Sequence, residues 1–186
     1  GTTFELKVQR PGVKKPLSFK ITRETIKVPQ VPYYGMLKPG IGYICLSGFA
    51  DGASREMKQA LIELKKQGAD RMVLDLRDNP GGSLDESVDI ANLFIPKGKK
   101  VVFTKGKMAS TNRDFYTAVE PVDSVMPLVV MVDGGTASSA EIVSGSLQDM
   151  DRAIVIGART FGKGFVQMIR ELPYGGNLKI TTSRYY

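Results

Sequence analysis

The stretch PLVVMVDGGTASSAEIVSGSLQD, residues 127–149, indicates how the chain folds. It opens with an apolar run of strand length, turns at two glycines after Asp133, and continues with apolar residues at helical spacing. A strand, a tight turn and a helix form the repeating unit of parallel α/β sheets. The turn also carries three hydroxyl residues, Thr136, Ser138 and Ser139, at the predicted start of the helix.

The same alternation of strands and helices extends from Ile41 to the last residue. Ser54 is the expected N-cap of the first predicted helix, and Gly68 is the residue expected just past its C-cap. This order predicts an α/β domain with a mainly parallel sheet, in which sites form at the carboxyl ends of the strands. Further strands are predicted at 41–49, 71–77, 100–104, 152–157, 164–172 and 176–186, and further helices at 54–68 and 84–95.

The first 30 residues have a different pattern. Apolar and polar residues alternate over 2–10 and again over 16–24, which predicts a β-hairpin. Residues 28–38 are rich in proline and glycine, so we expect a linker there. Two strands alone are only marginally stable, and both chain ends fall within strand-like patterns. We therefore expect a piece of a longer protein, with its main domain at 31–186.

Composition narrows the possible partners and compartments. The net charge of +7 could attract an anionic partner, but the lysines and arginines are spread along the sequence, which argues against nucleic-acid binding. The longest apolar runs have strand length, so no transmembrane helix is predicted. The single cysteine, Cys45, excludes an internal disulfide and is expected to be a buried thiol. Such a chain suits the cytosol and the bacterial envelope equally.

The hydroxyl cluster has two interpretations. A serine at a helix N-terminus lies near free backbone N–H groups, which would stabilise a developing oxyanion. Alternatively, Thr136, Ser138 or Ser139 is simply the N-cap, and Glu141 completes a capping box. The chain contains no histidine, so a nucleophilic serine would need a lysine or a carboxylate as its base.

Two further loops could complete such a site. Lys163 lies between two glycines in GARTFGKGFVQ, residues 157–167. A lysine with an ordinary pKa of about 10.4 is protonated at pH 7, but burial can lower that pKa by several units. The alternatives are a solvated loop lysine or a phosphate-binding lysine, for which the GxxxxGK[ST] pattern is missing. The Gly81-Gly82 pair in DLRDNPGG either offers a backbone donor to an oxyanion or forms a plain turn.

Together, the segments DLRDNPGG (75–82), GTASSAEI (135–142) and TFGKGFVQ (160–167) resemble the C-terminal processing peptidases, the tail-specific serine proteases of peptidase family S41. That family carries a DLR-N-PGG loop, a small-residue nucleophile segment and a T-[FY]-G-K-G loop in this order. It separates the nucleophile from the lysine by 25 positions, as Ser138 and Lys163 are separated here (163 − 138 = 25). Order and spacing carry the resemblance, since each motif alone is common.

The resemblance implies a serine endopeptidase with a Ser-Lys dyad that cuts protein or peptide substrates near their C-termini. Ser138 matches the nucleophile, Lys163 the general base, and Gln167 the residue that orients the lysine. Asp149 matches an acidic position at the end of the nucleophile helix, where we expect a supporting contact. The implied oxyanion-hole donors are Gly81 or Gly82 together with Ser139.

The resemblance also implies a setting. It predicts a ClpP/crotonase-like core, with residues 1–30 as the terminal strands of a PDZ domain and a linker. It implies a substrate bound as an extended strand, no metal or organic cofactor, and a membrane-associated or periplasmic location in the bacterial envelope. Two alternatives share the fold: a non-catalytic peptide- or ligand-binding module, and an acyl-CoA enzyme of the crotonase type. The oligomeric state stays open.

Overall fold

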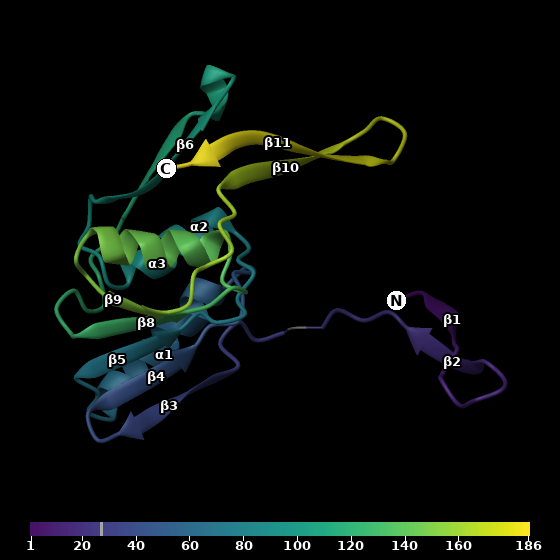
Figure 1. Cartoon of the computed structure of the whole chain (residues 1–186), viewed down its shortest axis with the longest axis horizontal. Helices are drawn as coiled ribbons and strands as arrows, with labels where there is room; N and C mark the ends of the chain where they lie inside the picture. The colour runs from purple at the N-terminus through teal and green to yellow at the C-terminus, as the bar shows by residue number, and fades with distance from the viewer. Residues whose placement is uncertain (27) are drawn as a thin grey trace.

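The computed structural model describes residues 1–26 and 28–186 (Figure 1). A five-stranded sheet has the order β3-β4-β5-β8-β9, and a four-stranded sheet has the order β10-β11-β6-β7. Helices α2 (Leu84–Asn92) and α3 (Ser139–Asp149) lie between these two sheets. Helix α1 (Ala53–Lys66) packs against β4 and α2.

The five-stranded sheet confirms the predicted parallel core. Its strands β4, β5, β8 and β9 run parallel, and β3 pairs antiparallel with β4 at one edge. Leu74 and Val130, at the centre of the sheet, are fully buried. Because parallel strands end at the same edge, the loops after β5, β8 and β9 meet there. The bounds are Tyr33–Lys38 (β3), Ile41–Cys45 (β4), Arg71–Asp75 (β5), Leu128–Val132 (β8) and Ile154–Gly157 (β9).

The four-stranded sheet corrects the expectation of one mainly parallel sheet. The strands predicted at 100–104, 164–172 and 176–186 exist, but all pair antiparallel in this second sheet. Strand β7 was not predicted, because four residues are too short to show an alternation. The bounds are Lys100–Gly106 (β6), Arg113–Tyr116 (β7), Phe165–Glu171 (β10) and Asn177–Tyr185 (β11), with a 3₁₀ turn at Ala109–Thr111.

The N-terminal hairpin is confirmed, and the predicted linker is too long. Strands β1 (Thr3–Val8) and β2 (Leu17–Thr22) pair antiparallel in a sheet of their own. The linker prediction of 28–38 is wrong over its second half, where β3 forms, because the Pro39-Gly40 pair makes a hairpin turn between β3 and β4. Lys27, within the N-terminal unit predicted at 1–30, lies outside the described residues.

Helix α1 begins differently from the prediction. Its N-cap is Gly52 rather than Ser54, because the Glu86 carboxylate accepts the N–H groups of both residues at 2.7 Å. Gly68 follows the C-cap with φ 93°, as predicted. Cys45 is free and half-buried, so the expectation of a buried thiol holds only in part. Across 1–26 and 28–186, no helix combines the length and apolarity needed to cross a membrane.

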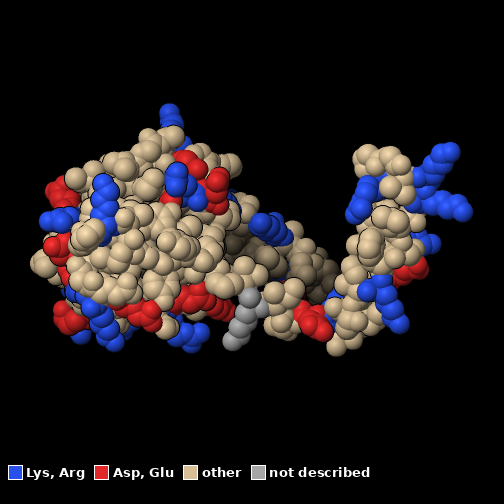
Figure 2. All heavy atoms as spheres, turned by 90° about the horizontal axis from the view of Figure 1, so that it is seen from below, with Lys and Arg blue, Asp and Glu red and all other residues tan. Residues whose placement is uncertain are grey.

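The surface agrees with the scattered charge of the sequence. On the face shown in Figure 2, Lys and Arg are interspersed with Asp and Glu over the main body, and Lys and Arg are also prominent on the N-terminal hairpin. A nucleic-acid footprint would require a continuous basic band, and the main body shows none on this face.

Candidate active site

Ser138 lies at a sharp junction between β8 and α3. Its φ of 57° is in the left-handed region, which a non-glycine residue adopts at a cost of about 1–3 kcal/mol. Its side chain is buried, and it is the N-cap of α3. A strained strand-to-helix turn that presents a serine is the geometry of a nucleophile elbow. The capping interpretation and the nucleophile interpretation therefore describe the same residue.

Hydrogen bonds join this turn to the loop after β5. The Asp133 carboxylate accepts the N–H groups of Asp78 and Gly135, both at 2.9 Å. The Asp78 bond, together with its other hydrogen bonds, holds the pKa of Asp133 below its ordinary value. The buried Thr136 hydroxyl donates to the Leu76 carbonyl at 2.7 Å and accepts the Asp133 N–H. These bonds bring the carboxyl ends of two neighbouring strands together.

The DLRDNPGG loop lies directly against Ser138. Asn79 is fully buried; its carbonyl accepts the Ala137 N–H at 2.9 Å, and its side-chain NH₂ donates to the Leu46 carbonyl at 2.7 Å. A Cβ added to Gly81 would lie 2.9 Å from Ser138 Cβ, so only glycine permits this close approach.

The two glycines of this loop differ in their hydrogen bonds. The Gly81 N–H donates to Asn79 Oδ1 at 2.9 Å. Within the part of the chain that the structure describes, no acceptor takes the N–H of Gly82 or of Ser139. The Ser139 hydroxyl donates to the Gly82 carbonyl at 2.9 Å, which links these two residues directly. In this arrangement Gly82 and Ser139 carry the unengaged donors.

Glu141 ties the lysine loop to the serine. Its Oε2 accepts the N–H of Ser138 at 2.8 Å and the N–H of Lys163 at 2.9 Å. Its Oε1 accepts the Thr160 hydroxyl and the Gly162 N–H, both at 2.7 Å. Burial alone would raise the pKa of Glu141, but these four donors outweigh it and hold the pKa below its ordinary value. The spacing of Glu141 predicted only a capping box; its bonds to the lysine loop were missed.

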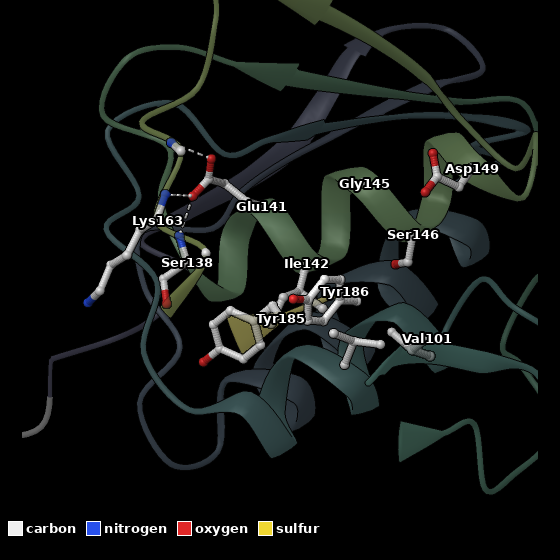
Figure 3. Close-up of a pocket in the computed structure, with 13 residues that line it drawn as sticks. Val101, Ser138, Glu141, Ile142, Gly145, Ser146, Asp149, Lys163, Tyr185 and Tyr186 are labelled. Atoms are coloured by element: carbon white, nitrogen blue, oxygen red, sulfur yellow. Dashed lines mark hydrogen bonds between the residues drawn. The ribbon is translucent and has the colours of Figure 1, made fainter. Parts of the chain in front are cut away.

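The Lys163 side chain does not contact the serine hydroxyl. Lys163 is half-buried and borders the same pocket as Ser138, but Figure 3 shows its side chain extending away from that residue. Among residues 1–26 and 28–186, no hydrogen bond or ion pair engages its ammonium group. The structure therefore brings together the backbones of Ser138 and Lys163, with the lysine head group turned outward.

A pocket of about 330 Å³ opens beside Ser138 and runs along α3 to Asp149 at its other end. Its wall is mostly apolar, with Val101 and Ile142 among the lining residues. Tyr185 also borders it, a residue that no sequence signal singled out. Gln167 is exposed on β10 outside this lining, and its side chain has no hydrogen bond within the described ranges.

An ion pair between buried Asp75 and exposed Arg77 stabilises the start of the DLRDNPGG loop. Asp75 is buried, and its carboxylate receives the Arg77 guanidinium at 2.7 Å and the Tyr43 phenol at 2.7 Å. Burial would raise the pKa of Asp75, but Arg77 and Tyr43 hold it below its ordinary value. Burial, together with the bond to Asp75, raises the pKa of Tyr43 to about 12.

In the described part of the chain, no group of His, Cys, Asp and Glu is arranged to hold a metal ion.

Comparisons with known proteins place these motifs in a family. Peptidase family S41 matches residues 40–186. The carboxyl-terminal-processing protease of Synechocystis sp. is 39% identical over 187 residues, covering 99% of this chain and 43% of that protein. The carboxyl-terminal-processing protease of Picosynechococcus sp. is 41% identical, covering 100% of this chain and 44% of that protein. The chain thus spans less than half the length of these relatives.

Solved structures agree. The photosystem II D1 C-terminal processing protease superposes with a TM-score of 0.75 at 30% identity, covering 100% of this chain and 51% of that one. An S41 protease structure from Bacteroides fragilis gives the same TM-score at 19% identity, a likeness that concerns the fold alone. The family match and these relatives together show that the chain belongs to peptidase family S41.

Proposed function

We propose that this chain carries the catalytic centre of a C-terminal processing serine endopeptidase, with Ser138 as nucleophile and Lys163 as general base. One observation carries the proposal most directly. Ser138 is held in a left-handed elbow, and the backbones of Ser138 and Lys163 bond the same oxygen of Glu141. With both backbones held by one carboxylate, we infer that the lysine side chain rotates to bring its amine to the hydroxyl.

The reaction is acyl transfer. Neutral Lys163 takes the proton of Ser138 as Oγ attacks the peptide carbonyl, and the carbonyl electrons move onto its oxygen. Backbone N–H groups stabilise that oxyanion. The protonated lysine then gives the proton to the leaving amine as the C–N bond breaks. Water hydrolyses the acyl-enzyme by the same proton path in reverse.

The oxyanion donors are the Ser139 N–H and one glycine of the Gly81-Gly82 pair. Gly82 is favoured, because its N–H has no acceptor among the described residues, whereas the Gly81 N–H is bonded to Asn79. Using Gly81 would require that bond to break first. Gln167 would orient the lysine only after a rearrangement, since its side chain does not reach the pocket lining here.

The substrate is a protein or peptide bound as an extended strand, as β-augmentation allows. The mostly apolar wall beside Ser138, including Val101 and Ile142, fits an uncharged side chain next to the scissile bond. We further assign residues 1–30 to the end of a PDZ domain and its linker, the core to the ClpP/crotonase type, and the protein to the bacterial envelope. These assignments rest on the family resemblance.

Two substitutions in the intact protein test the function. Ser138→Ala should lower kcat/KM for a peptide substrate by at least about 10⁴-fold, because it removes the nucleophile. Lys163→Arg should do the same, because arginine stays protonated. Ser144→Ala and Lys179→Arg are matched controls: Ser144 is buried on the same helix and Lys179 is exposed on β11. Peptidase activity retained by Ser138→Ala would contradict the proposal, whereas peptide binding without cleavage by the intact wild-type protein would favour a binding module.

A further inference from the structure

Tyr185 lies beside the nucleophile. It borders the same pocket as Ser138 and Lys163, and Figure 3 shows its ring next to Ser138, with the phenol oxygen at the end of the ring nearer that residue. Its backbone N–H donates to the Gly164 carbonyl at 3.0 Å, so β11 is bonded directly to the lysine loop. It pairs with Thr104 of β6, and its ring packs against the hydrophobic core. Its position is therefore fixed from three sides.

The contrast with Lys163 is informative. The lysine head group extends away from Ser138, whereas the phenol faces it. Burial raises the pKa of Tyr185, and the nearby Ser138 side chain offsets this rise only in part. The phenol is thus protonated at neutral pH and can donate. The charged groups that border the same pocket are Glu141 and Asp149 from α3 and Lys163 from the loop.

We propose that Tyr185 is a third catalytic residue of this centre, donating a hydrogen bond to Ser138 Oγ and thereby directing the serine proton toward Lys163. The proposal rests on the proposed function. A serine hydroxyl has one hydrogen and two lone pairs. When the phenol occupies a lone pair, the hydroxyl hydrogen points elsewhere, and the lysine amine is the base in the same pocket. Tyr185 keeps its own proton throughout; only the Ser138 proton is transferred.

Removing the single oxygen atom tests this idea. Tyr185→Phe keeps the ring and should lower kcat about tenfold or more, with KM and the melting temperature unchanged. Tyr174→Phe is the control, since Tyr174 is 98% exposed between β10 and β11 and lies outside the pocket lining. It should stay within about twofold of wild type. Phosphorylation of Ser138 by diisopropyl fluorophosphate, followed by mass spectrometry, should slow in the same proportion as kcat.

A fluorinated tyrosine at position 185 gives a second, independent readout. Its phenol is more acidic, so the alkaline loss of kcat should move to lower pH. The proposal is overturned if Tyr185→Phe keeps wild-type kcat, or if it changes KM alone, as a purely apolar wall would. Because Ser138→Ala tests the peptidase separately, an inactive Ser138→Ala beside a fully active Tyr185→Phe would reject only the role of Tyr185.

Discussion

The two halves of the proposed active site, the serine turn and the lysine loop, are built in different ways. The serine half lies in the core: Thr136 and Ser139 are fully buried, and Ser138 is 7% exposed. The lysine half is a surface loop in which Phe161 is 68% exposed. The serine half is held by the packing of β8 and α3. On the lysine half, one half-buried carboxylate, Glu141, accepts three of the loop's hydrogen bonds.

This difference predicts how substitutions divide between stability and activity. A change in the serine half disturbs buried hydrogen bonds and should lower the free energy of unfolding. A change in the lysine half should leave the fold intact and lower activity, because the loop contributes little to the core.

Among substitutions of residues that hold the two halves in place, Glu141→Gln should have the largest effect. The amide keeps one acceptor oxygen, but its NH₂ cannot accept the N–H groups of Ser138 and Lys163. Bonds to a charged group contribute about 1.5–3 kcal/mol each, so we expect about a 100-fold loss of kcat/KM. Glu120→Gln is the control, since Glu120 is an exposed loop carboxylate outside the pocket lining. If kcat/KM of Glu141→Gln stayed within twofold of wild type, the hydrogen bonds of Glu141 would not be needed to hold the lysine loop beside Ser138.

Substitution of two threonines should distinguish the serine half from the lysine half of the site. Thr136→Val leaves the Leu76 carbonyl and the Asp133 N–H unpaired in the core, so the free energy of unfolding should fall by about 3 kcal/mol. Thr160→Val removes one bond to Glu141, so activity should fall about tenfold with stability changed by less than about 1 kcal/mol. Urea unfolding and peptidase kinetics on both variants measure this. The reverse pattern would invalidate the comparison.

The pH dependence of the stability that Glu141 contributes should be the smallest effect. The pKa of folded Glu141 lies below its ordinary 4.5. A carboxylate with a depressed folded-state pKa stabilises the fold above pH 4.5, and this stabilisation is lost as the pH falls through the folded value. The difference in unfolding free energy between wild type and Glu141→Gln should therefore be constant above pH 5 and shrink in acid. Urea titrations from about pH 3 to 7 measure this difference in unfolding free energy. A difference that does not change with pH would show that Glu141 is not the titrating group.

Local sequence patterns predicted the parallel core and the peptidase family, but not the pairing of distant segments. The β8–α3 elbow and the Lys163 loop could be predicted because glycines flank apolar runs there. The second sheet was not, because an alternating strand such as 165–171 does not encode its partner. Ser54 failed as an N-cap because its competitor, Glu86, comes from another helix. Tyr185 meets Ser138 only through the fold, and no local pattern encodes that contact.

The most direct test of the central claim is covalent labelling of Ser138 itself. The intact protein would be treated with a fluorophosphonate probe and digested, and the modified peptide identified by mass spectrometry, for wild type and Lys163→Ala. The account predicts an adduct on Ser138 in wild type and its loss in Lys163→Ala, with both proteins folded. Equal labelling of Ser138 without Lys163, or labelling of another serine, would contradict it.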